Sequence, residues 1–104
     1  MFGLGIKSVS VDELAQRLSH DRAVVVDVRE PNEFASGHIK GSVNIPLGQL
    51  ASKVGGFDPA ADVFAVCRSG NRSASAVRIL KRAGFQHAYN VTGGTSAWRG
   101  KLVR

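Results

Sequence analysis

Two uninterrupted apolar runs limit most strongly what this chain can fold into. They span residues 23–26 and 63–66, and segments with helical character lie between and after them. Unbroken runs of β-branched residues are typical of strands in a parallel sheet that is covered on both faces. Strands that alternate with helices favour the same architecture. The sequence therefore predicts an α/β fold around a buried parallel sheet.

Other segments carry the signals of helices and shorter strands. Ser10 and Glu13 have the spacing of a capping box before an apolar face, so we expect a helix over residues 11–18. Pro31 in a first turn and Gly84 after a last turn mark one helix start and one helix end. The remaining expected elements are helices at 30–35, 47–54, 73–83 and 96–99, and strands at 42–45 and 87–91.

The length of the chain fits one domain. We expect the domain to span residues 1–104, with its core at about 8–100. The glycine-rich segment before Ser8 is expected to be a frayed arm. This segment lacks the charged start and the continuous apolar stretch of a signal peptide, and no segment is long enough to span a bilayer. We therefore expect a cytoplasmic protein with no membrane partner.

Cys67 is the only cysteine of the chain. One cysteine excludes an intramolecular disulfide, and His20, His38 and His87 lack ligand spacing, so we expect no metal. Lys and Arg number 14 against 8 Asp and Glu, and the resulting net charge of +6 attracts anions of many kinds. Nucleic acid is not expected as a partner, because the few aromatic residues are mostly Phe in apolar contexts.

A polar loop at residues 68–72 follows Cys67 and leads into the expected helix. In parallel α/β folds, loop amides and the next helix N-terminus form a site for negative charge. Because a cysteine reacts as its thiolate, its surroundings must lower its pKa. The helix dipole, the amides around Gly70, and the guanidinium groups of Arg68 and Arg72 would all do so. The alternative is a cysteine that only completes a buried strand, but this loop suits an anion better than it covers a core.

Arg72 is expected in the first turn of the helix, where its positive charge opposes the helix dipole. Arg72 therefore needs an anion nearby, either a ligand or an acidic side chain. Arg68 also fits the simpler interpretation of a solvated surface charge.

Four segments together resemble the successive signatures of the rhodanese family. They are residues 26–34 (VDVREPNEF), 37–46 (GHIKGSVNIP) and 67–73 (CRSGNRS), and Gly93-Gly94 with Ala97-Trp98. The resemblance implies a three-layer α/β/α fold with a five-stranded parallel sheet. It also implies a cysteine that carries a persulfide between a sulfur donor and a nucleophilic acceptor, with no metal or organic cofactor.

The resemblance assigns roles to individual residues. Cys67 is implied to be the nucleophile. The loop that binds a small anionic donor and cradles the persulfide comprises Arg68, Ser69, Gly70, Asn71 and Arg72. The residues expected to be mainly structural are Asp27, Arg29, Glu33, His38 and Ser73, with Asp27 and Arg29 satisfying each other and His38 nearest the mouth of the site.

The C-terminal part departs from the family pattern. Trp98 is expected in the core, and the segment after it is shorter than usual, so the last helix is expected to be abbreviated.

The size of the loop separates two reactions that this fold supports. Four residues stand between Cys67 and Arg72, whereas the related cell-cycle phosphatases have one more. The wider ring holds a tetrahedral phosphate over the sulfur, so the tighter ring favours a single extra sulfur atom. The phosphatase reaction also needs a general acid, and the sequence offers no clear candidate.

The reaction expected is ping-pong sulfur transfer from thiosulfate to cyanide or a thiol, including a thiol on a protein acceptor. Because there is no second cysteine, the persulfide cannot close into an internal disulfide. The alternative is a persulfide carrier or a regulatory binding module with little turnover, although such modules typically lose the cysteine. Arsenate reduction would need further redox cysteines or an external thiol. We expect a monomer or weak dimer.

Overall fold

The computed structural model describes residues 6–19 and 23–104, and its strands form one five-stranded sheet in the order β1-β5-β4-β2-β3. Every strand pairing is parallel. The strands are β1 (Lys7–Val9), β2 (Ala23–Asp27), β3 (Val43–Asn44), β4 (Asp62–Val66) and β5 (Ala88–Val91). The α/β fold with a five-stranded parallel sheet is confirmed.

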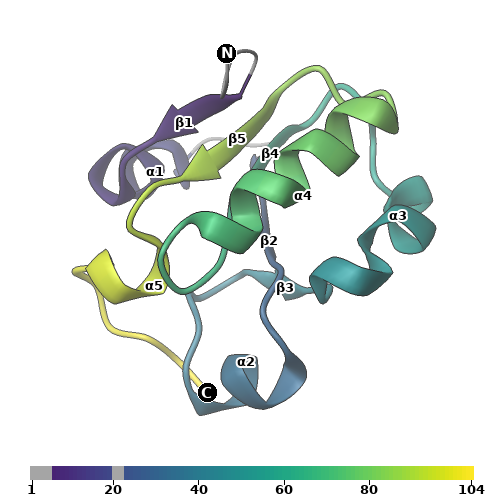
Figure 1. The fold of residues 1–104 in the computed structure, drawn as a ribbon. Helices are drawn as coiled ribbons and strands as arrows, with labels where there is room; N and C mark the ends of the chain where they lie inside the picture. The colour runs from purple at the N-terminus through teal and green to yellow at the C-terminus, as the bar shows by residue number, and fades with distance from the viewer. Residues whose placement is uncertain (1–5, 20–22) are drawn as a thin grey trace.

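Helices cover the two faces of the sheet, as Figure 1 shows, with α3 and α4 on one face and α1 on the other. The helices are α1 (Val11–Arg17), α2 (Pro31–Ser36), α3 (Leu50–Lys53), α4 (Asn71–Arg82) and α5 (Gly94–Ala97). Two 3₁₀ turns, η1 (Leu47–Gln49) and η2 (Val54–Gly56), flank α3. Among these elements, no helix is long and apolar enough to cross a membrane.

The central strand β4 sends alternate side chains to the two layers, because successive residues of a strand point to opposite faces. Val63, Ala65 and Cys67 belong to the apolar cluster that α3 and α4 cover. Phe64 and Val66 belong to the other cluster, which includes Leu14 of α1. This division explains why the apolar run has no polar member. It also puts the Cys67 side chain on the side of the sheet where α4 packs.

Strand β1 differs from the prediction, in which the chain before Ser8 is a frayed arm. Lys7 in fact begins β1 and pairs with Tyr89 of β5. The strand has only three residues at the edge of the sheet, and Val9 is its only buried one, so no alternating pattern marks it. Residues 1–5 of the expected arm lie outside the described residues.

Several helix boundaries also differ from the prediction. The helix expected at 47–54 is only the short helix α3 between two 3₁₀ turns. Helix α4 begins at Asn71 rather than at residue 73, and Gly70 precedes it with a left-handed φ of 110°. Helix α5 begins at Gly94 and ends at Ala97, whereas the expected helix covered residues 96–99. Trp98 therefore lies outside the helix and is only partly buried, packed against the cluster on the α1 face rather than within the core.

The C-terminal segment returns to the residue that follows α2. The backbone of Val103 forms an antiparallel bridge with His38, in which each amide donates to the other carbonyl oxygen at 2.8 Å. Figure 1 shows the C-terminus beside α2, at the same end of the molecule as the start of α4. The shortened tail thus pairs with the body of the protein.

Candidate functional site

The sulfur of Cys67 lies at the carboxyl end of β4, inside the turn that leads into α4. The amide of Gly70 donates to Cys67 Sγ at 3.1 Å, and the amide of Ser73 donates at 3.4 Å. Ser73 Oγ lies 3.3 Å from the same sulfur. Cys67 is buried, with 1% of its surface exposed. These donors are directed at a single atom, as an anion-binding turn requires.

The turn lowers the pKa of Cys67 from its ordinary value. Burial acts in the opposite direction and is the largest single influence, because a buried sulfur resists becoming a charged thiolate. The hydrogen bond between Cys67 Sγ and the Ser73 hydroxyl, and those from the amides of Ser73, Gly70 and Ser69, together outweigh it. Of the predicted causes, the loop amides are therefore among the leading ones, whereas the guanidinium groups are not.

A second backbone segment holds the start of the loop. The amides of Thr95 and Ser96 in α5 donate to the carbonyl oxygens of Cys67 and Arg68 at 2.9 and 3.0 Å. Gly94 packs so closely that a Cβ atom there would overlap the Cys67 carbonyl oxygen. The Gly93-Gly94 signature seen in the sequence therefore allows α5 to close against the loop that carries the sulfur.

Arg72 has the acidic partner that its position in the first turn of α4 required. Its two guanidinium nitrogens donate to the two carboxylate oxygens of Glu33 at 2.7 and 3.0 Å. This hydrogen bonding with Arg72 is the main cause that lowers the pKa of Glu33 to about 2, and the amide of Glu30 contributes. The same pair raises the pKa of Arg72. Glu33 therefore neutralises much of the positive charge of Arg72 that was expected to act on the sulfur.

Asp27 and Arg29 satisfy each other, as predicted. Arg29 Nη2 donates to Asp27 Oδ2 at 2.7 Å and to the Gly37 carbonyl oxygen at 2.8 Å. Both side chains are buried, with exposed fractions of 1% for Asp27 and 6% for Arg29. The pair ties the carboxyl end of β2 to the end of α2, and so it supports the helix that carries Glu33.

The other predicted site residues divide into exposed loop positions and one histidine outside the loop. Arg68, Ser69 and Asn71 are exposed to solvent around the buried sulfur. His38 stacks its ring on Phe34 at 3.6 Å between centroids, and its Nδ1 atom lies 2.8 Å from the Phe34 carbonyl oxygen. Its described contacts are thus with α2 and the C-terminal segment.

The contact of Asn90 with the loop was not predicted, and Ser73 contacts the sulfur more directly than its predicted structural role implied. Asn90 lies on β5, is 7% exposed, and accepts a hydrogen bond from the Ser73 hydroxyl while donating to the Gly70 carbonyl oxygen at 3.2 Å. The available signal was a polar residue inside an expected strand. Ser73 was expected to be mainly structural, but it contacts the sulfur through both its amide and its hydroxyl.

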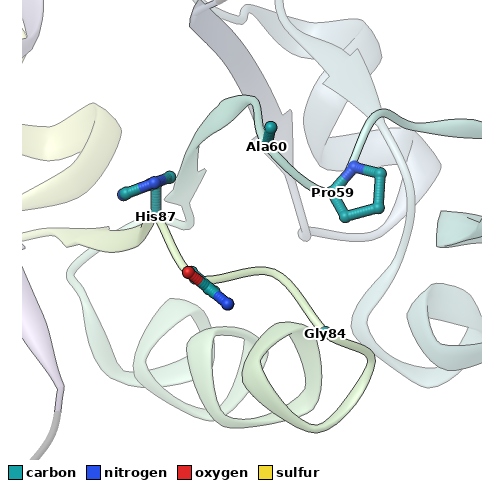
Figure 2. Close-up of a pocket in the computed structure, with 5 residues that line it drawn as sticks. Pro59, Ala60, Gly84 and His87 are labelled. Atoms are coloured by element: carbon teal, nitrogen blue, oxygen red, sulfur yellow. The ribbon is translucent and has the colours of Figure 1, made fainter.

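A hollow of about 230 Å³ lies beside the amino ends of β4 and β5, at the end of the sheet opposite Cys67. Figure 2 shows the residues around it. Pro59, Ala60, Gly84, Gln86 and His87 line it, where the chain enters β4 and β5. This hollow has no cysteine and no charged side chain in its lining. The converging hydrogen-bond donors described above lie instead around Cys67.

Comparisons with known proteins give the same picture. Residues 10–101 match the model of the rhodanese-like domain. YrkF of Bacillus subtilis, named as a candidate sulfur carrier protein, is 34% identical over 97 residues, which are 92% of this chain and 52% of that protein. The chain therefore spans about half the length of that relative.

Two further relatives match over most of their own length. Thiosulfate sulfurtransferase GlpE of Pseudomonas entomophila is 38% identical over 87 residues, which are 84% of this chain and 80% of that protein. The crystal structure of a rhodanese-like domain protein from Staphylococcus aureus superposes with a TM-score of 0.85 at 35% identity. That superposition covers 94% of this chain and 97% of the other.

Proposed function

The chain belongs to the rhodanese-like domain family, and from that premise we propose that it is a sulfurtransferase that carries sulfane sulfur as a persulfide on Cys67. The observation that carries the proposal is the cradle around the sulfur. Two amides and one hydroxyl surround Cys67 Sγ, and the pKa of the thiol lies below its ordinary value. A thiolate in such a cradle is both formed and held in place for attack.

The proposed donor is thiosulfate. Its negative charge suits a loop with two arginines in a chain of net charge +6. Arg68 is exposed and carries the charge next to the sulfur, whereas Arg72 is already paired with Glu33. We therefore assign the first contact with the donor to Arg68, and to Arg72 a fixed position on the rim of the loop. The relative GlpE, which is named for thiosulfate, supports this choice of donor.

The transfer proceeds in two steps that balance atoms and electrons. In the first, the Cys67 thiolate attacks the outer sulfur of thiosulfate, a new S–S bond forms, and sulfite leaves with the electron pair of the broken bond. In the second, cyanide or a thiolate attacks the terminal sulfur, so that thiocyanate or a new persulfide leaves and the Cys67 thiolate returns. The amides of Gly70 and Ser73 stabilise negative charge on the sulfur throughout.

The acceptor decides whether the protein turns over as an enzyme or delivers sulfur as a carrier. The chain has one cysteine, so the persulfide cannot be resolved within the same chain. An outside nucleophile must collect the sulfur, and a protein thiol fits the role as well as a small molecule does. The sulfur carrier name of the relative YrkF supports keeping this second form of the function. We further propose that residues 1–104 act as one domain.

Steady-state kinetics test the proposal. With thiosulfate and cyanide varied together, we expect parallel double-reciprocal lines, because sulfite leaves before cyanide binds. We expect Cys67→Ser to have no turnover above background and to keep the wild-type fold by circular dichroism. A carrier would release sulfite once per chain and then stop until a thiol is added. Intersecting lines, or turnover that survives in Cys67→Ser, would contradict the persulfide route.

A further inference from the structure

The Asn90 side chain forms hydrogen bonds with Gly70 and Ser73, the two residues whose amides donate to the sulfur. Its Nδ2 atom donates to the Gly70 carbonyl oxygen at 3.2 Å, and its Oδ1 atom accepts from the Ser73 hydroxyl. Gly70 and Ser73 are the residues that donate their amides to Cys67 Sγ. Asn90 is 7% exposed and reaches this position from the neighbouring strand β5. One buried amide therefore spans the cradle.

The donors and acceptors in this group fix how the protons are arranged. The Gly70 carbonyl oxygen can only accept, so it must face the Asn90 NH₂ group, and this turns Oδ1 toward Ser73. Oδ1 can also only accept, so the Ser73 hydroxyl must donate to it. A hydroxyl has one proton. Ser73 therefore cannot donate to Asn90 and to Cys67 Sγ, which lies 3.3 Å away, at the same time.

The two states of Cys67 make opposite demands on that proton. A thiol can donate its own proton to Ser73 Oγ, and the hydroxyl then remains with Asn90. A thiolate has no proton to donate, so the Ser73 hydroxyl adds to the stabilisation by the loop amides only if it rotates toward the sulfur and leaves Oδ1 without its donor. Losing a buried hydrogen bond costs free energy, and that cost falls on the thiolate state alone.

We propose that Asn90 is a positioning residue for Cys67, which competes with the sulfur for the single hydroxyl proton of Ser73 and so limits how far the cradle favours the thiolate. This deepens the proposed function, because the nucleophilicity of a thiolate decreases as it becomes too well stabilised. The Asn90 side chain then keeps the sulfur reactive toward the donor while it fixes the geometry of the loop.

Charged groups near the sulfur bear on the same equilibrium and must stay unchanged in a test. Arg72 on α4 interacts electrostatically with Cys67 and is paired with Glu33 on α2. Asp27 and Arg29 form a buried pair at the end of β2. Arg68 is exposed in the loop, while α5 carries no titratable side chain. Replacing Asn90 by an uncharged residue alters none of these charges.

The test measures the ionisation midpoint of Cys67 from the pH dependence of its alkylation by iodoacetamide. We expect Asn90→Leu to lower the midpoint by about one pH unit, since it frees the hydroxyl to donate to the thiolate. Ser73→Ala should raise the midpoint, and adding Asn90→Leu to Ser73→Ala should then change nothing. An equal shift with and without Ser73, or a rise in Asn90→Leu, would overturn the proposal.

A matched control and a measurement on the unmodified protein complete the test. Asn44 on β3 also donates two hydrogen bonds, to the Asp27 and Arg29 carbonyl oxygens at 3.0 Å each, so Asn44→Leu should leave the midpoint unchanged. In the wild-type protein, the NMR signals of the Asn90 side-chain amide should shift with the midpoint of Cys67. Signals that stay constant through that midpoint would overturn the proposal even if no Asn90 variant folds. Alkylation needs no sulfur donor, so failure of sulfur transfer leaves this result intact.

Discussion

The carboxyl and amino ends of the sheet differ in how their polar groups are buried. The carboxyl end holds a buried sulfur with its amide donors, a buried ion pair, and a close approach of Gly94 to the Cys67 loop. At the amino end, the chain leaves a hollow of about 230 Å³ and an ion pair between Arg17 and Asp62 that is about one-third exposed. Among the described residues, no buried side-chain nitrogen or oxygen lacks a hydrogen-bond partner. Converging donors on a buried sulfur thus distinguish the carboxyl end, and a hollow beside a partly exposed ion pair distinguishes the amino end.

Adding one methyl group to a glycine at each end is expected to give the largest difference in the free energy of unfolding. Gly94 and Gly84 both have positive φ, at 55° and 100°, but only at Gly94 would a Cβ atom meet backbone, the carbonyl groups of Cys67 and Arg68. We expect Gly94→Ala to destabilise the protein by about 4 kcal/mol, and Gly84→Ala by about 1 kcal/mol, in urea unfolding. Equal losses would show that backbone strain, and not packing against the Cys67 loop, governs Gly94.

The two ion pairs give the second contrast. Asp27→Asn leaves Arg29 buried without its carboxylate partner, so we expect a loss of about 3 kcal/mol. Asp62→Asn removes the partner of Arg17 where water reaches both side chains, and we expect a loss below about 1 kcal/mol. The same unfolding measurement compares them. Similar values for both variants would mean that the carboxyl end is no more tightly held than the amino end.

The Glu33–Arg72 pair makes stability at the carboxyl end depend on pH. Because folding lowers the pKa of Glu33 from 4.5 to about 2, the pair stabilises the protein above about pH 4.5 and loses this contribution as the pH falls toward 2. We expect Glu33→Gln to cost about 1 kcal/mol at neutral pH and to remove that part of the acid dependence. Glu13→Gln, at the same position in the first turn of α1, is the control and should change neither.

The smallest effect is expected in the hollow of Figure 2. His87 lines it and is exposed, so His87→Ala should change the free energy of unfolding by less than about 0.5 kcal/mol. The rate of thiocyanate formation should stay at the wild-type value. A several-fold loss of rate in His87→Ala would mean that the amino end takes part in the reaction, and the contrast between the two ends would fail.

Most of the fold was predictable because its signals are local. The apolar run before Cys67 and the capping pair Ser10 and Glu13 each mark an element by neighbouring residues, and the structure has a strand and a helix there. Strand β1 was not predicted because its three residues pair with β5, which lies in a distant part of the chain. Short edge strands depend on such long-range pairing and leave little pattern of their own.

The site shows the same division between local and distant information. Cys67, Gly70 and the need of Arg72 for an anion could be predicted from one loop. That Glu33 supplies the anion, and that Asn90 accepts a hydrogen bond from the Ser73 hydroxyl, depends on side chains brought together from α2 and β5. Sequence spacing does not record such meetings, because the fold alone decides which polar atoms share one point.

Sulfur is proposed to travel through a persulfide on Cys67, and intact-protein mass spectrometry detects that persulfide directly. The protein is first reduced, then incubated with thiosulfate and freed of small molecules. We expect wild-type protein to gain the mass of one sulfur atom, peptide mapping to place it on Cys67, and cyanide to remove it. The persulfide route would be contradicted if reduced wild-type protein gained no sulfur, or if Cys67→Ser protein gained as much sulfur as wild type.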